Sequence, residues 1–124
     1  MKLTLISIIL LSSNLFLTQD LIEGKVITQD DFPLMGSINL LKVQGRIIDY
    51  TISDFDGNFY FTNKSIEGMY LETHFMEEKK ITPIEFPTNS VLIKINYSQK
   101  VTREQCSKWQ KEMFKKYKLE FKEE

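Results

Sequence analysis

Only a few side chains in this 124-residue chain have the chemistry that catalysis or metal binding requires. Asp54 and Asp56 stand two residues apart and are followed by Gly57, a pattern that occurs both in calcium loops and in tight turns. His74 is the one histidine and Cys106 is the one cysteine. A single cysteine excludes an internal disulfide framework and an all-cysteine zinc site.

The aspartate-glycine pattern matches a turn better than a calcium loop. An EF-hand loop with Gly57 at its sixth position would begin on an isoleucine and end on an asparagine, and neither supplies the ligand needed there. We therefore interpret Asp54, Asp56 and Gly57 as the structural turn of a hairpin, because glycine takes a positive φ without steric cost. A cation held by these two aspartates and a loop carboxylate such as Asp31 is the alternative. We predict no metal and no cofactor.

Neither His74 nor Cys106 has a catalytic partner that the sequence identifies. A zinc site built on His74 would need carboxylates as its other ligands, and no spacing suggests one. We expect His74 on the surface-facing side of a strand. Cys106 falls on the apolar stripe of a helix, where a free cysteine behaves as a small buried hydrophobe. A nucleophilic role would need a neighbouring general base.

Aromatic side chains provide the candidate binding residues. Tyr60, Tyr70 and His74 fall on the predicted outer faces of strands, and Trp109 lies in the predicted C-terminal helix. Exposed aromatics on a β-sandwich stack on sugar rings or anchor protein partners. The alternative for the tyrosines is cross-strand packing between neighbours.

The composition limits the class of protein. Apolar residues make up 42% of the chain, enough for the core of one domain. Sixteen basic residues against 17 acidic ones give a net charge of −1, which argues against nucleic-acid binding. The basic residues are unevenly placed, since residues 100–122 hold eight of them with only three acidic residues.

Residues 1–19 have the layout of a secretory signal peptide. Lys2 precedes the mostly apolar residues 3–17, and the first acidic residue is Asp20. This run is shorter than the roughly 20 apolar residues of a membrane span. An uncleaved anchor or a buried strand is the alternative. We expect export, with cleavage near Gln19.

The segments that follow alternate with the period of β-strands. Turn signals separate them at the spacing typical of a sandwich or barrel. The predicted strands are residues 21–28, 37–43, 47–53, 59–61, 69–76, 81–86 and 91–97. Ile48, Tyr50 and Ile52 are expected on an inner face, as are Phe59 and Phe61. Pro83 marks an edge strand.

The pattern changes to helical spacing after Lys100. Thr102 and Gln105 form a capping box. The apolar stripe that follows consists of Cys106, Trp109, Met113, Phe114 and Tyr117. We predict an amphipathic helix over residues 103–118. Its stripe either covers a face of the sandwich, with lysines pointing outward, or lies on an anionic membrane or in a partner's groove.

The order of motifs resembles the carboxypeptidase regulatory-like domain, a transthyretin-like β-sandwich of Gram-negative envelope proteins. The matching residues are Gly24-Lys25-Val26, Pro33-Leu34-Met35-Gly36, Asp54-Phe55-Asp56-Gly57-Asn58-Phe59 and Gly68-Met69-Tyr70-Leu71. The resemblance covers residues 21–97 and excludes the C-terminal helix; Ser37 stands where the family usually has a small apolar residue. It implies an accessory module without catalytic residues of its own.

These observations define our expectations. We predict an all-β fold, a seven-stranded antiparallel Greek-key β-sandwich over residues 20–99, with an amphipathic helix and tail over residues 100–124. The expected function is that of a non-enzymatic binding or scaffolding module in the periplasm or on the cell surface of a Gram-negative bacterium. Its expected partner is another envelope protein or an outer-membrane component. A glycan- or peptide-binding sandwich is the alternative, and a small hydrolase is a third possibility.

Overall fold

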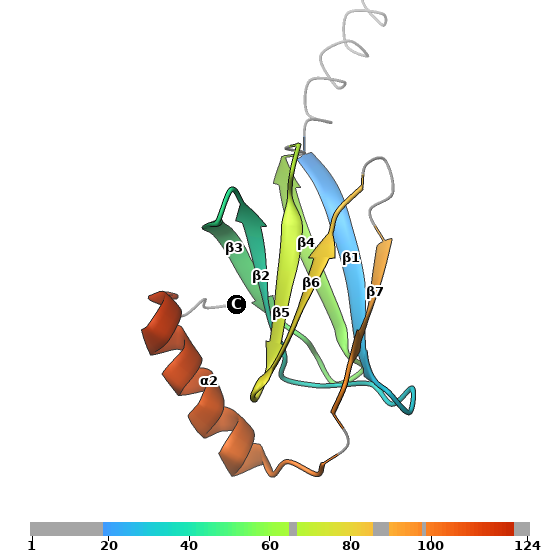
Figure 1. Ribbon diagram of the computed structural model, residues 1–124, viewed down its shortest axis with the longest axis vertical. Coiled ribbons are helices and arrows are strands. Elements are labelled where there is room, and N and C mark those ends of the chain that lie inside the picture. Colours follow the sequence, from blue (N-terminus) through green and yellow to red (C-terminus); the bar gives the residue numbers. More distant parts are fainter. Residues whose placement is uncertain (1–18, 65–66, 86–89, 98, 121–124) are drawn as a thin grey trace, which may run out of the picture.

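The computed structural model describes residues 19–64, 67–85, 90–97 and 99–120. The elements in chain order are β1 (Gln19–Thr28), β2 (Ile38–Val43), β3 (Arg46–Ile52), β4 (Asn58–Lys64), β5 (Tyr70–Phe75), β6 (Glu78–Pro83), β7 (Ser90–Ile95) and α2 (Arg103–Tyr117) (Figure 1). All seven predicted strands and the C-terminal helix are therefore present. The predicted signal peptide lies outside the described residues, except for Gln19.

The strands form two sheets. One has the order β4-β1-β7 and the other the order β3-β2-β5-β6. The core holds side chains from both, among them Ile22 and Val26 of β1, Leu41 of β2, Leu71 of β5 and Ile93 of β7, each fully buried. Ile22 and Val26 therefore lie on one face of β1, which is directed into the core.

The expectation of antiparallel pairing throughout is wrong for one pair of strands. β1 pairs with β4 in antiparallel orientation but with β7 in parallel orientation, from Glu23 opposite Ser90 to Thr28 opposite Ile95. The sequence shows no helical pattern between its strands, which favours antiparallel sheets. A parallel pair needs only a long crossover, and here the crossover is supplied by the strands of the other sheet.

The predicted hairpin at Asp54–Gly57 is only partly correct. The turn is present, because Gly57 N donates to Asp54 O at 2.9 Å and Asp54 N donates to Asn58 O at 2.9 Å. The strands on either side do not pair, however, since β3 and β4 belong to different sheets. The turn carries the chain from one sheet to the other. Phe59 and Phe61 are buried as predicted, in an edge-to-face contact with ring centroids 5.9 Å apart.

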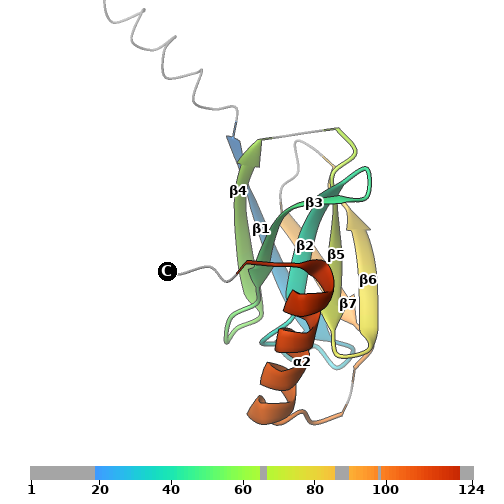
Figure 2. The same cartoon turned by 90° about the vertical axis from the view of Figure 1, so that its left-hand side faces the viewer.

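Strand β2 is buried on both of its faces. Residues 38–41 are fully buried, and the pairing with β3 shifts register between Leu41 and Lys42. In the sequence, Ile38 and Leu40 alternate out of phase with Leu41 and Val43, which indicates either a bulge or burial on both faces; the strand has both. One face lies toward the other sheet, and the second face lies beneath α2 (Figure 2). The molecule therefore has three layers: the sheet β4-β1-β7, the sheet β3-β2-β5-β6, and the helix.

The helix also corrects the predicted orientation of β3. Tyr50 and Ile52 lie on the face toward α2 rather than in the core between the sheets, since they are opposite Leu40 and Ile38. Tyr50 is buried there, in edge-to-face contact with Phe114 at 5.4 Å, whereas Ile48 and Ile52 are 39% and 38% exposed. Tyr50 and Ile52 share a face as predicted, but the sequence alone does not show whether that face lies against the helix or against the other sheet.

Candidate functional site

Helix α2 is held against its own sheet by aromatic and polar contacts. Its N-terminus has the predicted capping box, with Gln105 N donating to Thr102 Oγ1 and Thr102 N donating to Gln105 Oε1. Trp109 and Met113 are buried, and Trp109 packs on Phe75 with centroids 5.6 Å apart. Gln110 Nε2 donates to Gly36 O at 2.9 Å. The apolar stripe therefore covers the sheet within the same chain, as one of the two expectations stated.

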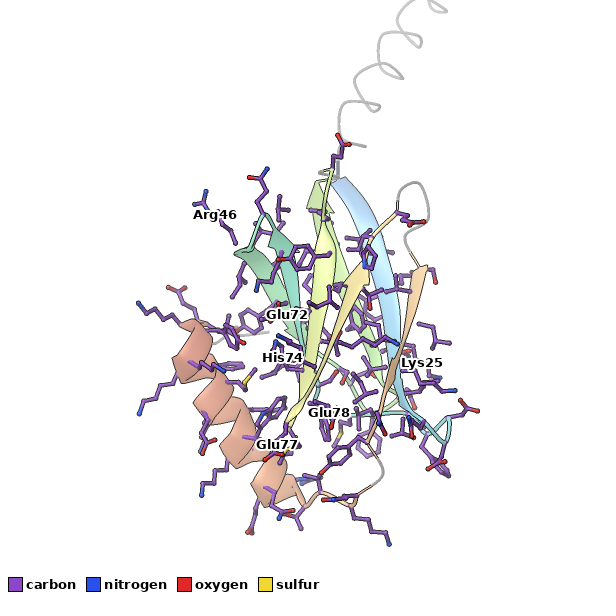
Figure 3. The ribbon with its side chains drawn as sticks, viewed as in Figure 1. Lys25, Arg46, Glu72, His74, Glu77 and Glu78 are labelled. Atoms are coloured by element: carbon purple, nitrogen blue, oxygen red, sulfur yellow. The ribbon has the colours of Figure 1, made fainter. Side chains whose placement is uncertain are left out.

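A charged cluster lies in the interface between α2 and the sheet. Glu72 Oε2 accepts from Lys42 Nζ at 2.9 Å, and Glu72 Oε1 is 2.7 Å from His74 Nε2 (Figure 3). The side chains of all three residues are at most 13% exposed. Because the carboxylate accepts, Nε2 is the donor. We call Lys42, Glu72 and His74 the sub-helix cluster.

The register of the strands explains this arrangement. In the pairing of β2 with β5, Glu72 lies opposite Leu40 and Tyr70 lies opposite Lys42. Lys42 and Glu72 are therefore diagonal neighbours on one face of the sheet, and His74 is the next residue on that face of β5. The helix closes the cluster, since the Tyr117 ring lies 5.4 Å from the His74 ring.

Burial and ion pairing set the protonation of the cluster. Burial alone would raise the pKa of Glu72, but hydrogen bonds from Lys42 and His74 outweigh it and the pKa is lowered. Burial alone would lower the pKa of Lys42, but its contact with Glu72 raises it. Burial lowers the pKa of His74, against the pull of Glu72. At neutral pH the cluster therefore holds an ammonium, a carboxylate and a neutral imidazole.

The expectation that His74 faces solvent is wrong. The side chain points outward from the sheet as predicted, but α2 covers that face and leaves the residue 7% exposed. Glu72 and Lys42 were not selected from the sequence. The signal that could have found them is the alternation of Tyr70, Glu72 and His74 on a strand that has an apolar opposite face.

The four candidate binding residues do not come together. Tyr60 is on β4 in one sheet, and it is 54% exposed. Tyr70 and His74 are on β5 in the other sheet, on the face toward α2, where Tyr70 is half-buried. Trp109 is buried between α2 and the core. Of the four, Tyr60 alone presents most of its ring to solvent.

The aspartates of the turn are occupied by backbone hydrogen bonds. Asp54 Oδ1 accepts from Asp56 N and from Asn58 N, both at 2.9 Å. Asp31, the third carboxylate considered for a cation, forms an ion pair with Lys94 at 3.1 Å. Among the residues described here, no three His, Cys, Asp or Glu side chains are grouped to bind a metal ion.

A polar network that the sequence did not reveal lies inside the sandwich. Thr73 Oγ1 donates to Asn39 Oδ1 at 2.9 Å, and Asn39 Nδ2 donates to Ser37 Oγ at 3.3 Å. Ser37 Oγ in turn bonds Ser53 Oγ at 2.8 Å. All four residues are buried. The network joins one end of the β2-β3 pair, where β2 begins and β3 ends, to β5, and it explains a serine at position 37.

Cys106 is half-buried on the first turns of α2. Burial raises the pKa of its thiol, so the protonated form is favoured at neutral pH. Its Sγ lies close to Gly36, where a Cβ atom would approach it to 2.8 Å. These contacts agree with the interpretation of Cys106 as a packing residue.

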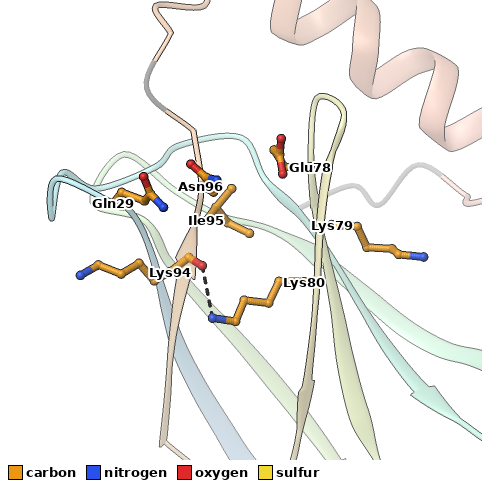
Figure 4. Close-up of a pocket in the computed structure, with 7 residues that line it drawn as sticks. All are labelled: Gln29, Glu78, Lys79, Lys80, Lys94, Ile95 and Asn96. Atoms are coloured by element: carbon orange, nitrogen blue, oxygen red, sulfur yellow. Dashed lines mark hydrogen bonds between the residues drawn. The ribbon is translucent and has the colours of Figure 1, made fainter.

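An open groove of about 350 Å³ lies between β6 and β7 (Figure 4). Its lining residues are Gln29, Glu78, Lys79, Lys80, Lys94, Ile95 and Asn96. Lys79 and Lys80 belong to β6, which begins at Glu78, and Lys94 belongs to β7. Pro83 closes the same strand, which is an edge strand as predicted.

No protein-family model matches the chain, and no curated protein matches it. In the part of the chain that the structure describes, no helix is both long and apolar enough to span a bilayer.

Proposed function

We propose that this chain is a non-enzymatic binding or scaffolding module that is exported to the cell envelope of a Gram-negative bacterium. The observation that carries the proposal is the position of His74. The one histidine of the chain is hydrogen-bonded to Glu72 and covered by Tyr117, so it holds the helix to the sheet. The one thiol is half-buried with a raised pKa. The groups best suited to catalysis therefore serve packing.

The packing of two motif glycines supports a fold of the carboxypeptidase regulatory-like type, a Greek-key β-sandwich. A Cβ atom on Gly24 would lie 2.0 Å from the ring of Phe59, and one on Gly57 would lie 2.4 Å from Val26 O. The glycine-valine motif of β1 and the aspartate-glycine-phenylalanine motif of the turn thus pack against each other. The roles of these residues are structural, as the resemblance implies.

The surface that remains for a partner includes Tyr60. On the outer side of the sheet β4-β1-β7, Tyr60 is 54% exposed beside Glu23, its cross-strand neighbour. Leu92 is 65% exposed on the same sheet. We propose that the partner is another envelope protein or an outer-membrane component. Because the apolar stripe of α2 is used within the chain, any membrane contact of the helix would be electrostatic, through its outward lysines.

Glycan or peptide binding by exposed aromatics is the second candidate. It is favoured by the same exposure of Tyr60, because a half-exposed ring flanked by a carboxylate suits a sugar face as well as a side chain. Titration of the purified chain with glycans distinguishes the two candidates. Loss of glycan binding in Tyr60→Ala, with Tyr70→Ala as the matched control, would favour the glycan candidate.

The proposal is tested by fractionation of the cell envelope, with cross-linking and sequencing of the mature N-terminus. We expect the chain in the envelope fraction, cross-linked to a defined partner, with its N-terminus near Gln19. A cytoplasmic chain that still begins at Met1 would contradict the proposal. Hydrolytic turnover that persists through purification and disappears in His74→Ala would also contradict it, and would revive the hydrolase.

A further inference from the structure

Strand β4 is the outermost strand of the sheet β4-β1-β7, and its pairing with β1 determines which backbone groups face outward (Figure 2). Val26 N of β1 donates to Gly57 O at 2.8 Å, directly before β4 begins. In an antiparallel pair, successive residues of a strand direct their backbone groups alternately to one neighbour and to the other side. The odd-numbered residues of β4 therefore bond to β1, and the N–H and C=O groups of Tyr60 and Thr62 point away from the sheet.

Asp54 occupies the edge groups at the beginning of β4. Asp54 N donates to Asn58 O, and Asn58 N donates to Asp54 Oδ1, both at 2.9 Å. These bonds agree with the outward direction deduced for the even-numbered residues. Within the described residues no strand pairs with the next groups along this edge, the N–H and C=O of Tyr60 and of Thr62.

The other three edge strands carry features that oppose pairing with a further strand. Charged side chains, proline and occupied backbone groups are the usual protection of a sheet edge. On β3, Asp49 Oδ1 accepts from Tyr50 N at 2.8 Å. β6 ends on Pro83, and Lys80 Nζ of β6 donates to Lys94 O of β7 at 3.4 Å.

The sequence of β4 has none of these features before its last residue. Residues 58–63 include no charged residue and no proline, and Lys64 ends the strand. Aromatic and β-branched residues favour strand pairing, and here Tyr60 and Thr62 are both exposed on the outer face of the sheet. Of the four edges, β4 is therefore the one that is suited to accept another strand.

We propose that two copies of this chain pair through β4 in antiparallel orientation, which joins their sheets into one of six strands. Because Asp54 occupies the groups of Asn58, the register that uses all the open groups places Tyr60 opposite Thr62 of the second copy. The two-fold axis repeats this pair, so the copies exchange four backbone hydrogen bonds. In the same register Lys64 falls opposite the neutral Asn58, so no like charges meet and the strand is complementary to itself.

This dimer is compatible with the proposed binding function and goes beyond it. Pairing through the edge leaves the outer face of the joined sheet open. The two Tyr60 rings become diagonal neighbours on that face, at a separation that aromatic side chains can span. The inference does not depend on export, because it rests on the backbone groups of β4.

The test measures the mass of the purified full chain by sedimentation equilibrium over a range of concentrations. We expect a reversible equilibrium between monomer and dimer. Thr62→Pro removes an N–H that β1 does not use, and proline is tolerated at such edge positions. Each copy then loses one donor to the other, so the dissociation constant of the dimer should rise at least about tenfold.

Leu92→Pro is the matched control on the other edge of the same sheet. Lys94 O accepts from Lys80 and so faces away from β1, and the backbone groups of Leu92, two residues earlier, face the same way. This substitution should leave the dissociation constant unchanged. Far-UV circular dichroism and the melting temperature show that both proline variants are folded.

A second set of variants does not depend on proline. Tyr60→Lys should weaken the dimer, because it removes the ring and places two lysines diagonally across the interface. Addition of Thr62→Glu to that variant places each lysine opposite a glutamate of the second copy and should restore the dimer. Amide exchange should also slow at positions 60 and 62 as the concentration is raised.

Each other outcome overturns the proposal. A chain that is monomeric at every concentration leaves the edge of β4 to a strand of a different protein. Equal weakening by Thr62→Pro and Leu92→Pro, or no recovery with Thr62→Glu, places the contact between copies elsewhere. These results are independent of fractionation: a cytoplasmic chain that dimerises through β4 would contradict the proposed envelope function and leave this inference intact.

Discussion

Glu72 bridges Lys42 and His74 beneath the C-terminal helix, with its two carboxylate oxygens 2.9 Å and 2.7 Å from their nitrogens. Each oxygen thus has its own donor, and none of the three side chains is more than 13% exposed. A buried carboxylate is costly unless its lone pairs are satisfied. The bridge therefore explains how a strand with charged residues on one face accepts a helix over that face.

Removal of the carboxylate charge should destabilise the fold. Glu72→Gln keeps the shape of the side chain but leaves the Lys42 ammonium without its counter-ion. Because the cluster is near the protein surface, we expect a loss of about 1–3 kcal/mol in the free energy of unfolding. Urea denaturation measures it. Glu67→Gln, on an exposed turn, is the matched control, and an equal loss there would refute the role of the bridge.

Stability should fall below pH 6.5. Burial lowers the pKa of His74 from 6.5. Just below pH 6.5 the histidine is therefore more protonated in the unfolded chain than in the folded chain. The stability of the fold with a neutral His74 is fully present above pH 6.5, and it decreases as the pH falls from 6.5 through the folded pKa of the histidine. The pKa of Glu72 is lowered from 4.5, so a second loss begins below pH 4.5.

The histidine step can be isolated because the chain has one histidine. His74→Gln retains a donor for Glu72 but does not titrate. We expect the melting temperature of the variant to be flat between pH 7 and pH 5, where that of the parent chain declines. The charged groups that face His74 from neighbouring elements are Lys79 and Lys116, which also oppose its protonation. A parallel decline in both proteins would contradict the assignment.

Docking of the helix should depend on Trp109. Its ring is 9% exposed and packs on Phe75. Truncation by Trp109→Ala should cost about 3 kcal/mol, the usual loss for a large buried aromatic side chain. Hydrogen exchange should show that α2 loses protection before β1 and β2 do. Lys111→Ala, on the exposed side of the helix, should change stability by less than about 0.5 kcal/mol.

Gly24 should be intolerant of any side chain. A Cβ atom would lie 2.0 Å from the Phe59 ring in the core between the sheets. We expect Gly24→Ala to cost about 1–3 kcal/mol through overpacking. The double variant with Phe59→Leu should recover part of that loss, and thermal melts measure both. If the second substitution adds its own full cost, the two residues are not coupled in this way.

The sequence predicted the strands, the helix and its cap because each depends on local spacing. Alternation placed Phe59 and Phe61 in the core, and the Thr102–Gln105 pair located the start of α2 at Arg103. The wrong predictions concern residues whose burial depends on an element that is far away in the sequence. Tyr50 and His74 point away from the core between the sheets, and only the packing of α2 makes that face an interior.

Neither the sub-helix cluster nor the groove between β6 and β7 could be predicted from the sequence. The sub-helix cluster joins β2 to β5, whose partners are 30 residues apart in the sequence, so no local pattern announces it. The groove between β6 and β7 depends on which strands end each sheet. Pro83 indicated that β6 is at an edge, but the parallel pairing that leaves β7 at the other edge has no signal in the residues of β7.

The most direct test of a binding function is photo-cross-linking from position 60 in intact cells. A photoreactive phenylalanine derivative replaces Tyr60, and the same derivative at Ile48, exposed on the other sheet, is the control. We predict one defined adduct in the envelope fraction from position 60 that is absent from position 48. The account is contradicted if neither position gives an adduct there while the purified chain shows a turnover that His74→Ala abolishes.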